Sequence, residues 1–204
     1  MRRRMLASVG GKPLPYDAEV EYIEGTGTQW IDTGVLANDR TVARIRFIAT
    51  EYTSSVFFGN YLGNGHLFNF FIRGNNWSYF QLKSSTIQTT SFGSLNMVLN
   101  VELGNNYIKD LDTDTEVISG ASQSGLVSDA TLKWFYYDRS SIVSGKGKIY
   151  STVILDGADL IRNLVPVRFT NENGVSEGAL YDRVSGQIFR NAGTGAFVIG
   201  PDKA

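Results

Sequence analysis

Short stretches in which apolar and polar residues alternate recur along most of this chain, separated by turns that contain glycine or asparagine. In residues 41–49, for example, Ala43 and Ile45 would share one face of an extended strand, while Arg44 and Arg46 would share the other. Roughly a dozen or more such stretches follow one another about 8–12 residues apart, with hardly a helical pattern among them. We therefore expect an all-β fold in which two antiparallel sheets pack as a β-sandwich, in preference to βαβ units or a closed barrel.

Two later stretches extend this expectation. In residues 95–103 the alternation places apolar side chains, Met97 among them, on one buried face of a strand. Residues 158–164 fit either a short strand or a single helical turn. Pro166 then favours extended backbone in the residue before it.

The two ends of the pattern are alike. Residues 20–34 and residues 179–200 each read as a strand, a glycine-containing turn and a second strand, and each contains a Gly-Thr-Gly motif, at 25–27 and at 193–195. Such a pattern predicts a β-hairpin with one buried face at each end. Neither motif has the Lys-Ser/Thr pair or the following helix that a Walker-type phosphate loop requires, so we interpret both as turns.

Length and composition favour one domain. The chain has 204 residues, of which 42% are hydrophobic and 19% are charged. This composition provides a sizeable core and carries too little charge for a disordered chain. Residues 1–17 contain Gly10-Gly11 and Pro13-Leu14-Pro15 without periodicity. We expect them to be a flexible leader, and residues 18–204 to be a single β-sandwich domain.

Charge and cysteine content exclude several classes of function. The formal net charge is -1 and the pI is about 5.9, so no long-range attraction to nucleic acid is expected. The basic run Arg2–Arg4 precedes only a short apolar stretch, and no apolar run approaches the length of a transmembrane helix. We expect a soluble chain without a signal peptide or membrane insertion, synthesised in the cytoplasm. The absence of cysteine excludes disulfides, thiol nucleophiles and thiolate metal sites.

Four segments, taken together and in their order, resemble a known family. They are residues 22–34, 147–156, 164–168 and 180–195. In this order they resemble the concanavalin A-like (laminin-G-like) jelly-roll domains of bacterial prophages and gut bacteria, over nearly the whole chain. The resemblance implies a jelly roll whose first and last strands are neighbours. It also implies a module that recognises a glycan or a cell-surface protein, in a phage tail or surface protein that contacts other virion proteins as a homotrimer.

An acidic segment is the first candidate for chemistry. Asp110, Asp112, Asp114 and Glu116 occupy every second position and would share one face of a strand. Their oxygens could bind calcium, although the spacing excludes an EF-hand because Ala121 stands where the bidentate acid belongs. Alternatively, Asp112 and Glu116 could act as the paired carboxylates of a laminarinase-like glycoside hydrolase. We favour a third interpretation, an exposed hairpin turn stabilised by Asp and Thr side chains.

Aromatic residues beside turns are the candidates for ligand binding. Asn75, Asn76, Trp77 and Tyr79 combine aromatic rings, which stack on the C–H faces of sugars, with amides that reach sugar hydroxyls. Trp30 also lies beside a turn. For Trp134, on an alternating strand, a position in the core is favoured because a large aromatic side chain buries extensive apolar surface.

These observations favour a non-enzymatic recognition module without a cofactor. His66 is the only histidine, so no multi-histidine metal site can form, and we expect it to lie in a loop or at the start of a strand. The alternatives are the glycoside hydrolase described above and a purely structural virion protein.

Overall fold

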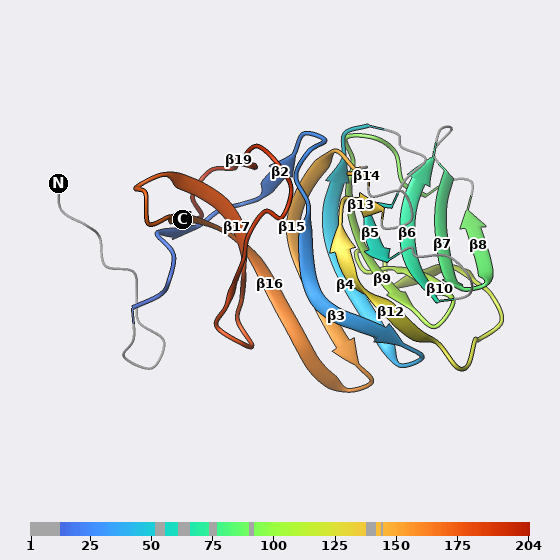
Figure 1. The fold of residues 1–204 in the computed structure, drawn as a ribbon. Helices are drawn as coiled ribbons and strands as arrows, with labels where there is room; N and C mark the ends of the chain where they lie inside the picture. Colours follow the sequence, from blue (N-terminus) through green and yellow to red (C-terminus); the bar gives the residue numbers. More distant parts are fainter. Residues whose placement is uncertain are drawn as a thin grey trace.

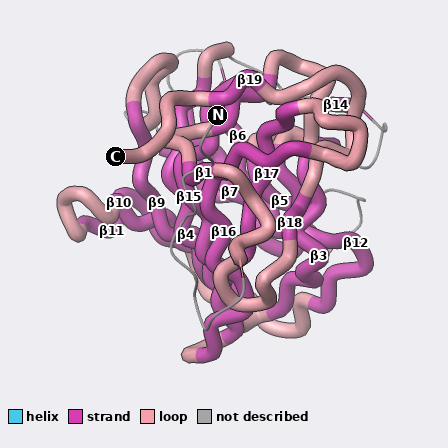
Figure 2. The backbone as a smooth tube through the Cα atoms, turned by 90° about the vertical axis from the view of Figure 1, so that its left-hand side faces the viewer, coloured by secondary structure: helices cyan, strands magenta, loops and turns pink. Residues whose placement is uncertain are grey.

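Two antiparallel sheets packed face to face form the fold in a computed structural model of this protein (Figure 1). The structure describes residues 13–51, 56–60, 66–73, 77–89, 92–137, 142–143 and 145–204. In these ranges strands are joined by turns and loops without a helix, as the tube in Figure 2 shows. The predicted all-β sandwich is therefore confirmed. The same residues contain no helix long and apolar enough to cross a membrane.

Within the described residues, the larger sheet contains eleven strands. Eight follow one another across it, in the order β11 (Thr115–Ser119), β10 (Tyr107–Asp110), β9 (Val98–Gly104), β4 (Thr41–Ala49), β15 (Gly147–Asp156), β16 (Asp159–Thr170), β17 (Ser176–Asp182) and β18 (Ile188–Phe189). Three short strands extend it: β1 (Ala18–Glu19) beside β16, β2 (Ile23–Gly25) beside β15, and β19 (Val198–Ile199) beside β2. The β10–β11 hairpin projects from one side of the molecule (Figure 2).

The smaller sheet contains six strands in the described part of the chain. Their order is β3 (Ile31–Asn38), β12 (Val127–Trp134), β5 (Phe58–Asn60), β6 (Leu67–Arg73), β7 (Trp77–Lys83) and β8 (Ser85–Thr89). A separate two-residue ladder joins β13 (Tyr136–Tyr137) to β14 (Ile142–Val143).

The core lies between the two sheets and is rich in aromatic side chains. Phe47 from the larger sheet meets Trp134 and Phe70 from the smaller sheet, with ring centroids 5.9 and 5.8 Å apart. Trp134 is fully buried, as predicted, and its indole N–H donates a hydrogen bond of 2.9 Å to the hydroxyl of Thr152. The predicted faces of β4 are also confirmed, since Ile45 is buried and the arginines on either side of it face outward.

The two ends of the chain meet, but not as two hairpins. β19 pairs with β2, and an isolated bridge joins Val20 to Asp202, so the predicted closeness of the first and last strands is confirmed (Figure 1, blue and red). The pairing of β17 with β18 also confirms a hairpin in the later segment. The hairpin predicted for residues 20–34 is wrong, because β2 joins the larger sheet and β3 joins the smaller one. The turn at residues 25–27 crosses between the sheets.

The structure corrects the expectation for Met97 and shows which of two alternatives holds for residues 158–164. Met97 is 46% exposed rather than buried, because Asn96 adopts a positive φ of 60° and strand β9 begins only at Val98. Residues 158–164 belong almost entirely to the long strand β16. Within the segment expected to be a leader, the ring of Tyr16 packs 4.9 Å from the ring of Tyr181.

Candidate functional site

Of the four residues predicted to bind a ligand, two lie in strand β7 and two lie outside the described residues. Asn75 and Asn76 lie outside the described residues. The backbones of Trp77 and Tyr79 belong to β7, whose neighbour on one side is β6, but their side chains are outside the description. The predicted cluster therefore stays a prediction.

The acidic segment forms the turn that we favoured. Asp110 ends β10, residues 111–114 form the turn, and β11 begins at Thr115. The four carboxylates consequently do not share one strand face. The hydrogen bonds lie within this hairpin, because one oxygen of Asp110 accepts the N–H of Asp112 at 2.9 Å and the other accepts the hydroxyl of Thr113 at 2.9 Å.

The remaining carboxylates of the turn are also paired. The carboxylate of Asp112 accepts a hydrogen bond of 2.7 Å from the amide of Asn100, and that of Asp114 lies 2.5 Å from the ammonium of Lys109. Among the described residues, no group of three or more His, Asp or Glu is placed to hold a metal ion. Each aspartate thus has a structural role in shaping the turn.

His66 immediately precedes β6, which confirms a position at the start of a strand. Its Nδ1 lies 2.7 Å from the carbonyl oxygen of Val127 in β12. Since a carbonyl only accepts, Nδ1 carries the hydrogen and donates it. The imidazole thereby links the start of β6 to β12, two strands that β5 separates in the smaller sheet.

A stacked aromatic pair marks a second candidate site. The sequence predicted that Trp30 lies beside a turn, but it did not predict that Trp30 pairs with Tyr136. The ring of Trp30 lies 4.3 Å from the ring of Tyr136 with 29° between their planes, and both side chains are partly exposed. They line an open depression of about 440 Å³, which we call the aromatic depression. The described residues that line it are Gly27, Thr28, Trp30, Tyr136, Ala192, Gly193 and Thr194.

Both Gly-Thr-Gly motifs contribute to this depression, because backbone hydrogen bonds hold their loops together. The N–H of Ala192 donates to the carbonyl of Trp30 at 2.9 Å, and the N–H of Thr194 donates to the carbonyl of Thr28 at 2.9 Å. The hydroxyl of Thr28 donates in return to the carbonyl of Thr194 at 2.8 Å. Segments about 160 residues apart in sequence therefore form one wall.

Two amide side chains hold this wall in shape. The oxygen of Gln29, which is buried, accepts the N–H of Thr26 at 2.8 Å, and its nitrogen donates to the carbonyl of Ala196 at 3.1 Å. The oxygen of Asn191 accepts the N–H of Trp30 at 3.1 Å. These bonds fix the backbone that carries the indole ring.

Gly193 is required by the close approach of the two loops. A Cβ at this position would lie 2.0 Å from the carbonyl oxygen of Thr28 and 2.8 Å from the ring of Trp30. Any larger residue must displace one loop from the other. The sequence pattern predicted only that this glycine is part of a turn.

Comparisons of the chain with protein-family models, with curated proteins and with solved structures gave no match. The fold itself is a sandwich of two antiparallel sheets.

Proposed function

We propose that this chain is a non-enzymatic recognition module that binds carbohydrate, built as a concanavalin A-like jelly roll. The observation that carries the proposal is the stacked pair of Trp30 and Tyr136 in the aromatic depression. Sugars present C–H faces that pack on aromatic rings, and a binding site combines such apolar surface with a few polar groups that fix orientation. The hydroxyls of Thr28 and Thr194 supply polar groups in the same lining.

The charge of the lining favours a neutral saccharide. Among the described residues of the lining there is no Asp, Glu, Lys, Arg or His. Outside this lining, the ammonium of Lys133 lies 5.7 Å from the centre of the Tyr136 ring in a cation–π contact. A neutral saccharide can therefore pack on the described part of the lining without facing an ionised side chain there.

The biological setting that we propose is a phage or prophage tail-associated protein or a surface protein. The support is the resemblance to concanavalin A-like domains together with the two-sheet fold. In that setting the chain would assemble as a homotrimer with other virion proteins and would contact a glycan or a protein on a cell surface.

The glycoside hydrolase alternative finds no specific support. A retaining enzyme needs two carboxyl groups about 5–5.5 Å apart on either side of the scissile bond. Asp112 lies in a turn and is bonded to Asn100, whereas Glu116 follows in β11. We therefore keep the binding module as the proposed function.

A glycan array tests the proposal with three proteins, namely the wild type, Trp30→Ala and Trp77→Ala. We expect the wild type to bind a neutral saccharide, Trp30→Ala to lose at least about tenfold in affinity, and Trp77→Ala to bind as the wild type does. Loss of one stacked ring is expected to have this effect because aromatic contacts dominate such sites. Trp30→Phe is the matched variant, since it keeps a ring at the same position.

Circular dichroism of each variant confirms that loss of binding does not reflect unfolding. Loss of binding in Trp77→Ala alone would move the site to β7 and would contradict the proposed depression. If the wild type binds no saccharide on the array, carbohydrate recognition is wrong, and the structural alternative is favoured.

A further inference from the structure

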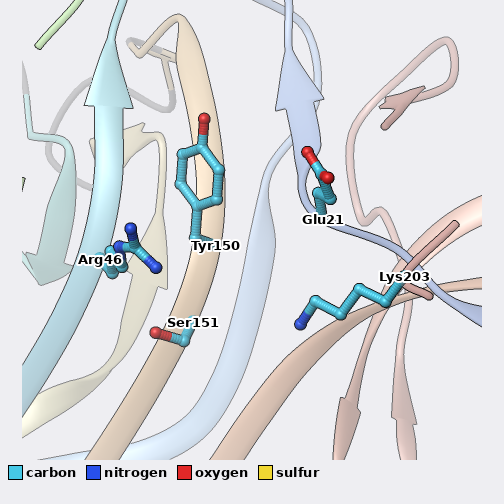
Figure 3. A pocket seen from close by; sticks show the side chains of 5 residues that line it. All are labelled: Glu21, Arg46, Tyr150, Ser151 and Lys203. Atoms are coloured by element: carbon cyan, nitrogen blue, oxygen red, sulfur yellow. The ribbon is translucent and has the colours of Figure 1, made fainter. Parts of the chain in front are cut away.

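A second depression lies on the outer face of the larger sheet, away from the core (Figure 3). Its volume is about 430 Å³, and the described residues that line it are Glu21, Arg46, Tyr150, Ser151 and Lys203. In Figure 3 the guanidinium of Arg46 and the ammonium of Lys203 approach from opposite sides of strand β15, which carries Tyr150 and Ser151. We call it the charged depression.

A β-bulge in β15 creates the floor of this depression. Ile149 pairs with Phe47 and Ser151 pairs with Arg46, so Tyr150 is an extra residue on the β15 side of the ladder. Both Tyr150 and Ser151 are partly exposed, whereas the residues on either side of them are buried. A bulge redirects side chains in this way, and here the side chains of both Tyr150 and Ser151 contribute to the lining that also contains Arg46 (Figure 3).

Neither Arg46 nor Lys203 belongs to an ion pair between described residues. The guanidinium of Arg46 instead lies 5.5 Å from the centre of the Tyr150 ring, which orients it by a cation–π contact. The carboxylate of Glu19, on which Lys203 acts electrostatically, lies 2.6 Å from the guanidinium of Arg183. Both cations are therefore available to an anion from solution.

The net charge of the lining favours a ligand with a single negative charge. Among the described residues of the lining, Arg46 and Lys203 contribute two positive charges and Glu21 contributes one negative charge, which leaves one positive charge. A guanidinium binds a carboxylate through two parallel N–H bonds. Glu21 would repel a phosphate dianion more strongly than a carboxylate, while its oxygens and the hydroxyl of Ser151 suit the hydroxyl groups of a sugar.

We propose that the charged depression is a second saccharide site, which takes a uronic acid unit with its carboxylate on Arg46 and Lys203. This goes beyond the neutral saccharide proposed for the aromatic depression, and it depends on different residues. The two ends of the chain are needed to build the site, because the N–H of Glu21 donates to the carbonyl of Pro201 at 2.9 Å and the N–H of Lys203 donates to that of Glu19 at 2.9 Å.

Isothermal titration calorimetry with the whole chain tests this site. The probes are trigalacturonate, a mannuronate trisaccharide and a hyaluronan tetrasaccharide, each compared with its methyl ester. We expect at least one uronate to bind, and its ester to bind about tenfold or more weakly because it lacks the charge that Arg46 pairs with. Arg46→Gln and Lys203→Gln should each weaken binding by about 10- to 100-fold, as expected for a charge-assisted hydrogen bond.

Arg44→Gln is the matched control, because Arg44 lies on the same strand and face but is paired with Glu102 at 2.6 Å. The affinity of Arg44→Gln for the uronate should lie within about twofold of that of the wild type, since the ion pair of Arg44 with Glu102 is not part of the depression. Equal losses in Arg44→Gln and Arg46→Gln would indicate attraction by the general field of the sheet and would overturn the proposal.

Three other results would overturn it as well: no binding of any uronate, equal binding of acid and ester, or displacement of the uronate by an equimolar concentration of inorganic phosphate. The variant Trp30→Ala should leave uronate binding unchanged. Failure at the charged depression is thus distinguishable from failure at the aromatic depression.

Discussion

The hydrogen bond between Trp134 and Thr152 crosses the core from one sheet to the other, and its removal tests how the sandwich is held together. Trp134 belongs to β12 of the smaller sheet and Thr152 to β15 of the larger sheet. Both residues are fully buried, and the indole N–H lies 2.9 Å from the hydroxyl oxygen. Water therefore cannot replace either partner when the other is removed.

The magnitudes follow from this burial. Trp134→Phe removes on the order of 50 Å² of apolar surface, worth about 1 kcal/mol, and leaves the Thr152 hydroxyl without its partner, which costs about 1–3 kcal/mol more. Thr152→Val leaves the indole N–H unpaired at a cost of about 1–3 kcal/mol. The double variant leaves neither group unpaired, so it should cost only about 1 kcal/mol, the contribution of the missing ring.

Equilibrium unfolding in urea, followed by far-ultraviolet circular dichroism, measures all four free energies of unfolding. We expect the double variant to be more stable than the sum of the single effects predicts by about 2 kcal/mol or more, with an unchanged dependence on urea concentration. Additive single effects, with the double variant least stable, would refute the reasoning that these two buried groups satisfy each other.

Three further predictions concern the C-terminal part of the chain, from Asp182 onward. Burial raises the pKa of the Asp182 carboxyl, but hydrogen bonds from backbone N–H groups and the Ser185 hydroxyl lower it below its usual value. Its stabilisation is therefore present above about pH 4 and lost as the pH falls through the folded-state pKa. Asp182→Asn should cost about 1–3 kcal/mol in urea unfolding at pH 7 and less at pH 3; an equal cost at both would contradict this. Gly193→Ala should cost about 1–3 kcal/mol and weaken neutral saccharide binding, because its Cβ would meet the carbonyl of Thr28, and unchanged binding would argue against this. Removal of residues 190–204 should abolish cooperative unfolding, which calorimetry would detect; a persistent transition would show that these residues are dispensable.

The alternation of side chains predicted the strands better than it predicted their connections. In β4 the period of two decides which residues face the core, so Ile45 is buried and Arg46 is exposed. The same pattern does not say whether a turn returns to the neighbouring strand or crosses to the other sheet. At residues 25–27 it crosses, because the hydrogen-bonding edges of β2 are taken by β15 and β19.

The candidate sites depend on contacts that no local pattern contains. Trp30 was recognised beside a turn, but its partner Tyr136 lies over one hundred residues later in a different part of the chain. The bulge at Tyr150 leaves no signal in the sequence, since only the pairing with β4 shows that one residue is extra. By contrast, the acidic turn at residues 111–114 is local, and the turn preferences of Asp and Thr predicted it.

The three tryptophans of this chain allow one direct test of the proposed recognition site. Each gives a separate indole N–H signal in a proton–nitrogen NMR spectrum, and single Trp→Phe variants assign the signals of Trp30, Trp77 and Trp134. Titration with the neutral saccharide that binds best on the array should shift the Trp30 signal and leave that of the buried Trp134 in place. A shift of the Trp77 signal alone, or no shift of the Trp30 signal at saturating saccharide, would contradict the proposal that the loops of the two Gly-Thr-Gly motifs form the binding site.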